Sequence, residues 1–167
     1  MERKLRLIRG ERPRESFEKE ATHILEEARM ILPGIQALFG FQLICVFQDR
    51  FYTHLSNFDQ SLHVCAILLV VISIGLLMAP AAYHRQAEAG RISQFFLHLS
   101  SRYLTIGMFP LALAISIDVF IVVKTVFAGS ALATVLSLLM FLTLLGLWFF
   151  QPRWGNYVRS KNLFGKS

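Results

Sequence analysis

Residues 30–51 read MILPGIQALFGFQLICVFQDRF, and this stretch decides how the rest of the chain is interpreted. A helix needs about 20 mainly apolar residues to cross a bilayer, and the stretch is long enough to do so. It also holds the pair Pro33-Gly34 and three glutamines, Gln36, Gln42 and Gln48. Because steps of six residues turn about 240° around a helix, the three amides do not share one face. We therefore expect a packed membrane span rather than the lining of a pore.

The composition of the whole chain also indicates a membrane protein. Of its 167 residues, 54% are hydrophobic and 17% are charged, and the mean hydropathy is +0.51. Soluble domains carry roughly 25% charged residues, so this chain has more apolar side chain than a small soluble core could cover. The net charge is +6, and most basic residues after residue 30 flank apolar segments. This placement favours anionic lipid headgroups as partners, and we expect no nucleic-acid partner.

Four apolar segments are long enough to be membrane spans. They cover about residues 30–48, 62–82, 103–124 and 130–150. Continuous apolar runs of this length exclude ordinary strands, and backbone groups in lipid need partners within their own helix. The sequence therefore predicts an all-α, polytopic membrane protein whose four transmembrane helices form one domain over residues 16–150.

The segment before the first span predicts an amphipathic juxtamembrane helix. From Ser16 onward, apolar residues recur every three or four positions while glutamates occupy the other faces. A helix over residues 16–50 would be roughly 50 Å long against about 30 Å of hydrocarbon, so its first turns must lie outside the lipid. Proline at the Pro33-Gly34 pair is expected to kink the helix there. Residues 1–15 are expected to be disordered or loosely ordered, and residues 151–167 form a basic tail.

The basic residues also predict the orientation of the chain. Fifteen of its 17 Lys and Arg residues precede the first span, separate the second from the third, or follow the fourth. Only Arg50 and Lys124 fall on the other side. Because short cytoplasmic segments are enriched in Lys and Arg, both termini are expected in the cytoplasm.

Two stretches of the chain are similar to a known family. The first combines Glu27-Ala28-Arg29 with LPGIQALF at residues 32–39, Phe41, Leu43 and the run at 47–51, and the second is APAAYHR at 79–85. These residues resemble a family of small bacterial membrane proteins, a domain of unknown function with four predicted transmembrane helices. Some of its members carry a label resembling a sodium/proton antiporter. The resemblance implies the four-span architecture and a bacterial inner membrane, and it transfers no catalytic or binding residue.

One candidate polar cluster lies at the predicted cytoplasmic edge. It combines Glu27, Arg29 and Gln36 of the first helix with His84 and Arg85 at the end of the second. Glu27 could pair with Arg85, and histidine changes its charge near neutral pH. Two interpretations stay open: a structural clamp between the two helices that also contacts lipid headgroups, or an entrance for protons or cations.

Asp118 is the sole acidic residue deep in a predicted span. A charge in lipid costs several kcal/mol, so such a residue is a functional candidate by default. It could take part in transport, pair with another subunit, or reach toward the membrane surface. Lys124 is a candidate partner, although a spacing of six residues places it on a different helical face. One acid without a broken helix pair is little for a self-contained transporter.

The sequence contains no nucleophile elbow, phosphate-binding glycine loop or HExxH motif. Cys45 and Cys65 lie in apolar runs without metal-ligand spacing, and we expect free, buried thiols. We therefore expect no catalysis, no cofactor and no metal. The predicted function is a non-enzymatic assembly, scaffold or accessory subunit, either a homo-oligomer or part of a larger membrane complex. The alternative is an oligomeric protein that conducts protons or cations through Asp118 and the Glu27/His84 region.

Small residues at a spacing of four predict where helices approach closely. The pairs are Gly75 and Ala79, Ala112 and Ser116, and Ala133 and Ser137. Without long side chains at such positions, two helix backbones can come near each other.

Overall fold

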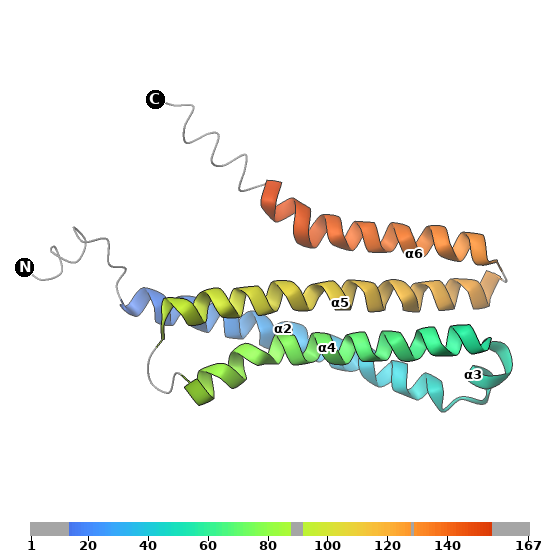
Figure 1. Ribbon diagram of the computed structural model, residues 1–167, viewed down its shortest axis with the longest axis horizontal. Helices are drawn as coiled ribbons and strands as arrows, with labels where there is room; N and C mark the ends of the chain where they lie inside the picture. The colour runs from blue at the N-terminus through green and yellow to red at the C-terminus, as the bar shows by residue number, and fades with distance from the viewer. Residues whose placement is uncertain (1–13, 88–91, 128, 155–167) are drawn as a thin grey trace, which may run out of the picture.

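The computed structural model describes residues 14–87, 92–127 and 129–154, with side chains from residue 18 onward. Over these residues the protein is a bundle of long helices (Figure 1). In chain order the elements are α2 (Arg14–Val46), α3 (Asp49–His54), α4 (Asn57–Ala87), α5 (Gln94–Phe127), α6 (Ser130–Leu145) and the π-helical turn η1 (Gly146–Phe150). Our expectations for residues 1–13, and for residues 155–167 of the basic tail, lie outside this description.

The predicted fold class is confirmed. Among the described residues, four helical segments are long and apolar enough to cross a membrane: Glu18–Val46, Asn57–Ala87, Gln94–Phe127 and Ser130–Trp154. Each begins or ends several residues beyond the apolar run read from the sequence, because a helix continues past the lipid boundary with polar residues. The predicted juxtamembrane helix and the first span form a single helix, α2, which runs on through Pro33.

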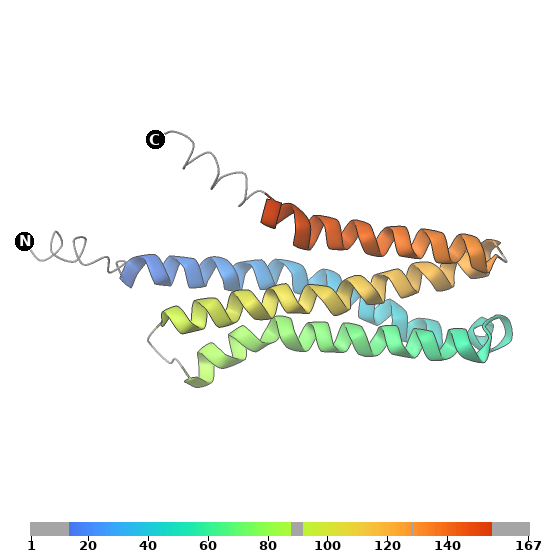
Figure 2. The same ribbon diagram turned by 45° about the horizontal axis from the view of Figure 1, so that its top comes forward.

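The helices run alternately up and down (Figure 1). α2 begins at one end of the bundle, and α3 lies at the other, which we call the α3 end; α6 runs away from the α3 end and stops short of the opposite end. α5 is central, since it packs along α4 and α6, while α2 crosses both α4 and α5 (Figure 2). The α3 end therefore brings together the last turns of α2 and α5 and the first turns of α4.

The core is densest between α4 and α5. Its buried residues include Ala66, Val70 and Leu77 of α4 and Leu104, Leu111 and Ala114 of α5. At one crossing Ser73 donates a hydrogen bond of 2.7 Å to the backbone carbonyl of Gly107. A Cβ atom at Gly107 would lie 3.3 Å from the Cβ of Leu76, so the small residue allows this close approach.

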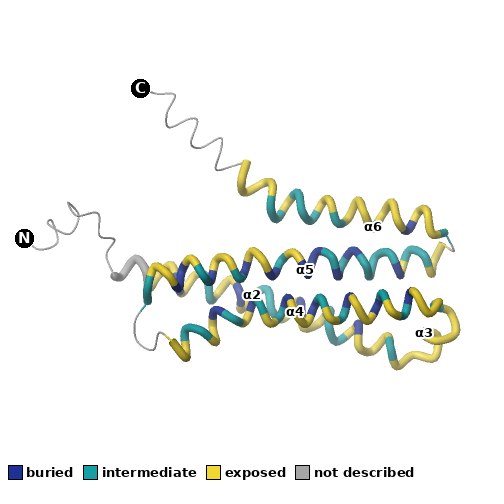
Figure 3. The backbone as a smooth tube through the Cα atoms, in the orientation of Figure 1, coloured by how far each residue is buried: buried dark blue, intermediate teal, exposed yellow. Residues whose placement is uncertain are grey.

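α6 is the least buried of the long helices (Figure 3). In the most apolar part of its span 6% of residues are buried, against 39% for α5. Ala133 is buried near its start, and Phe141 packs edge to face on Phe109 of α5. Toward its C-terminal end α6 diverges from α5 (Figure 1). It therefore presents most of its apolar surface away from the bundle.

The α3 end is shaped by two short connections. Ser56 caps α4: its hydroxyl accepts the backbone N–H of Asp59 and donates to the Asp59 carboxylate at 2.6 Å. Between α5 and α6, Gly129 adopts an extended conformation, and its carbonyl accepts the N–H of Ala133. These connections are short, and the last turns of α2 and α5 lie close to the first turns of α4.

Candidate functional site

The candidate site is built around a hydrogen bond that joins α2 to α5. Gln42 on α2 is 3% exposed, and its Nε2 donates to Oδ2 of Asp118 on α5 at 2.8 Å. Because Gln42 is buried, water cannot easily replace Asp118 as the acceptor of its amide. The pairing gives the intramembrane carboxylate a donor from within the same chain.

His63 of α4 completes the polar cluster. It is 6% exposed, and its Nε2 lies 2.9 Å from the backbone carbonyl oxygen of Gln42. A carbonyl only accepts hydrogen bonds, so Nε2 carries a proton in this contact. Nδ1 then faces Oδ1 of Asp118 at 3.8 Å.

We call Gln42, His63 and Asp118 the polar triad. Its members come from α2, α4 and α5, one from each helix that meets at the α3 end. The ring of Phe51 from α3 packs on the His63 imidazole with centroids 5.4 Å apart. The triad therefore ties three spans together and is covered by α3.

A second charged pair lies closer to the end of the bundle. The Lys124 ammonium contacts both carboxylate oxygens of Asp59, at 2.7 and 2.8 Å. The Asp59 side chain is 5% exposed and that of Lys124 is 32% exposed. Lys124 therefore pairs with the start of α4 and not with Asp118, the partner considered from the sequence.

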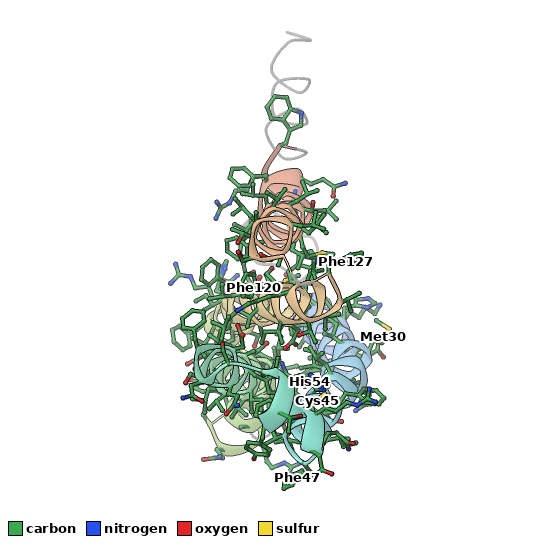
Figure 4. The ribbon with its side chains drawn as sticks, turned by 90° about the vertical axis from the view of Figure 1, so that its right-hand side faces the viewer. Met30, Cys45, Phe47, His54, Phe120 and Phe127 are labelled. Carbon is green, nitrogen blue, oxygen red and sulfur yellow. The ribbon has the colours of Figure 1, made fainter. Side chains whose placement is uncertain are left out.

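The triad borders a cavity of about 630 Å³ at the α3 end. Apolar side chains of α2 and α5 contribute to its walls, among them Leu38, Ile121 and Val122. Gln42 also lines the cavity, and its Oε1 is buried without a hydrogen-bond partner. Viewed onto this end, His54 and Cys45 lie toward the middle of the bundle, whereas Phe47 and Met30 lie at its periphery (Figure 4). The site is thus a cavity with apolar side chains in its lining and with polar side chains contributed by α2, α3, α4 and α5.

The cluster predicted at the cytoplasmic edge, unlike the triad, is mostly exposed. Glu27, Arg29, Gln36 and Arg85 are exposed, and no ion pair or hydrogen bond between described residues links Glu27 to Arg85. His84 is half-buried against the ring of Phe96, at 5.3 Å, and its Nδ1 is buried without a partner. The two interpretations of this cluster stay predictions.

Sequence reasoning selected Asp118 but missed Gln42 and His63 as its partners. Each is a polar residue in an apolar run, spaced so that no pattern within one helix reveals it. The available signal was that all three lie within three turns of the α3 end: Gln42 about one turn before Val46, His63 about two turns after Asn57, and Asp118 about two and a half turns before Phe127. Because these depths differ, they indicate one end of the bundle and do not by themselves pair the three residues.

The described residues form neither a candidate metal site nor a disulfide. No group of three His, Cys, Asp or Glu side chains among them could hold a metal ion. Cys45 and Cys65 are free thiols, as expected, but the expectation that they are buried is wrong. Both side chains are exposed, because Cys45 lines the cavity and Cys65 lies on an outer face of α4.

These features define a class: a multi-pass α-helical membrane protein with four candidate spans and a polar triad inside the bundle. The chain belongs to a family of unknown function, DUF6328, whose model matches residues 10–152. The match covers most of the chain and so extends well beyond the two stretches that suggested a family from the sequence. Comparison with curated proteins and with solved structures gives no match.

Proposed function

We propose that the protein is a non-enzymatic subunit of an assembly in the bacterial inner membrane, with both termini in the cytoplasm. The distribution of basic residues supports this orientation. In the sequence, 15 of the 17 Lys and Arg residues precede the first span, separate the second from the third, or follow the fourth. Among the described residues, Arg50 and Lys124 lie at the α3 end, and Lys124 is paired with Asp59. The α3 end therefore carries very little free positive charge, as expected for a periplasmic side.

The exposure of α6 is the observation that carries the assembly proposal. Lipid chains are as apolar as leucine, so helices associate in membranes through close packing. α6 diverges from α5, and Gly146 near its end has open space where a side chain would stand. A hollow of about 700 Å³ borders Gly146, Phe150 and Trp154. We assign this surface to a second copy of the chain, since closed two-fold dimers are the commonest assemblies.

Cysteine cross-linking tests this assignment directly. In a chain with Cys45 and Cys65 replaced by serine, L142C places a thiol on the outer face of α6, where Leu142 is 56% exposed. V71C serves as the matched control, because Val71 faces outward on α4 and is 45% exposed. We expect oxidation to give a covalent dimer with L142C and monomers with V71C. The mass of the native particle in lipid nanodiscs provides a second measurement.

A monomeric particle without L142C cross-links would remove the assembly proposal. A stoichiometric complex with a different membrane protein would support the role as a subunit and replace the second copy as its partner.

The polar triad favours a second function, conduction of protons or cations by an oligomer. Its observation is the carboxylate of Asp118, 21% exposed, facing the His63 imidazole inside a membrane helix. A buried acid beside a histidine can accept and release a proton without leaving an isolated charge in lipid. The cavity reaches the triad from the α3 end, and the Glu27/His84 region lies toward the other.

Flux measurements in liposomes test this second function. Wild-type protein is expected to move protons or cations faster than empty liposomes, and D118N is expected to abolish the excess. D59N is the control, because it alters an acid outside the triad. Flux equal to that of empty liposomes would exclude conduction.

A further inference from the structure

The cavity at the α3 end has the features of a binding site. We propose that it binds a lipophilic primary amine, whose ammonium group is held by the Asp118 carboxylate and whose hydrocarbon body lies along the apolar side chains of the lining. This proposal concerns a single chain. It therefore does not depend on assembly through α6.

Asp118 selects a donor with positive charge. Oδ2 of Asp118 accepts one hydrogen bond from Gln42, and carboxylate oxygens have capacity for more. An ammonium group carries three donors, no acceptor and a positive charge, so it can bind this carboxylate where Asp118 borders the cavity. An alcohol offers a single donor, and a carboxylate ligand would face the carboxylate of Asp118.

The apolar walls select the rest of the ligand. A volume of about 630 Å³ lies within the range of pockets for small molecules, about 300–1,000 Å³. Leu38 and Ile121 line the interior, from α2 and α5 respectively. An alkyl chain or ring system can therefore fill the cavity below the ammonium group.

The route of entry is lateral, between α2 and α5. Phe41 of α2 and Val122 and Val126 of α5 line the cavity and are 68%, 60% and 67% exposed. These side chains lie on the surface of membrane helices, so the opening faces the lipid. α3 covers the end of the bundle with Phe51, which is buried. A ligand dissolved in the bilayer is therefore favoured over a strongly hydrophilic one.

Arg50 adds a limit on the charge of the ligand. It lines the cavity from α3, at the end nearest the aqueous phase. A second ammonium group on the ligand would meet this guanidinium. The site is therefore suited to a ligand with one positive charge.

The two native cysteines allow a test with the full chain in detergent. Cys45 lines the cavity, whereas Cys65 on α4 is exposed and lies outside its lining. Alkylation of each thiol by N-ethylmaleimide is followed by mass spectrometry, with decylamine or decanol added at equal concentration. We expect decylamine to slow alkylation of Cys45 at least fivefold and to leave Cys65 unchanged. Decanol, with the same chain and no charge, is expected to protect Cys45 less than twofold.

Two variants separate binding through Asp118 from non-specific partitioning of the two compounds into the detergent. D118N keeps the shape and an acceptor for Gln42, and it is expected to abolish the difference between decylamine and decanol. V122W narrows the opening without touching the triad, and it is expected to remove protection by either compound. Because D118N could also impair folding, the thermal transition of the wild-type protein is measured with both compounds. We expect decylamine to raise its midpoint more than decanol does.

Two results would overturn the proposal. One is equal protection of Cys45 in the wild-type protein by decylamine and decanol, with equal thermal shifts. The other is a folded D118N protein that still prefers decylamine. Neither result would bear on the cross-linking of α6, so failure of this proposal is distinguishable from failure of the assembly proposal.

Discussion

Gln42 and Asp118 are joined by a hydrogen bond of 2.8 Å although 76 positions separate them in the chain. The bond fixes how far α2 is shifted along α5 and how each helix is rotated about its axis. Apolar packing tolerates small changes in both, because one leucine contact resembles another. A single donor and acceptor in an apolar surrounding have no equivalent alternative. The pair therefore specifies the arrangement of these two spans.

Replacing Gln42 with methionine is expected to destabilise the bundle. Q42M keeps the length of the side chain but leaves Asp118 without its donor, with an expected loss of about 1–2 kcal/mol of unfolding free energy. Unfolding by sodium dodecyl sulfate, followed by circular dichroism, measures the change. Q36M is the matched control, because Gln36 lies on the same helix and is exposed. Equal stability of Q42M and Q36M would contradict a role for the bond.

The fold was predictable from the sequence because its main determinant is local. Four runs of apolar residues must be helical in lipid, whatever the remainder of the chain does. The boundaries were less predictable: α4 begins at Asn57, five residues before the apolar run, because Ser56 supplies a cap. The cap forms its hydrogen bonds outside the lipid, in a polar segment where hydropathy does not show at which residue a helix begins.

The site was only partly predictable, because it depends on rotation and depth across helices. Asp118 stood out by its charge, but the rotation of α2 that brings Gln42 to face it cannot be read from either helix alone. The small residues show the same limit. Ala112, Ser116 and Ala133 are buried, whereas Gly75 is exposed. Gly107, which has no small residue four positions away, marks a close approach of α4 and α5.

The ion pair between Lys124 and Asp59 is expected to hold the start of α4 against the end of α5. K124M leaves a carboxylate that is 5% exposed without its cation, and we expect a loss of about 1.5–3 kcal/mol. K124R retains the charge and is expected to lose less. The double variant D59N/K124M removes both charges and should recover part of the loss. Thermal denaturation in detergent measures the order of stability of the three variants. A double variant less stable than K124M would contradict the expected order.

The crossing of α4 and α5 is expected to resist even one added methyl group. In G107A the new Cβ would lie 3.3 Å from the Cβ of Leu76, an atom fixed to the backbone. The helices must separate, at an expected cost of about 1–3 kcal/mol. G75A is the matched control on α4, since nothing lies within 4 Å of its Cβ position. We expect G75A to be neutral or slightly stabilising, because alanine favours helix more than glycine does. Comparable losses in the two variants would show that helix propensity, and not the crossing, decides the result.

The hydroxyl of Ser73 is expected to contribute more than that of Ser116, although both are buried. Ser73 donates across the helix interface to the carbonyl of Gly107, whereas Ser116 donates to Ala112 within α5. The carbonyl of Ala112 already accepts a backbone hydrogen bond in its own helix. Removing the Ser116 hydroxyl therefore changes the stability of the protein little. We expect S73A to lose about 0.6–1.7 kcal/mol and S116A to lose less. If α4 and α5 are held together at this crossing, S73A and G107A should also be non-additive when combined, because each change already loosens the contact on which the other depends. A double variant whose loss equals the sum of the two would indicate independent effects.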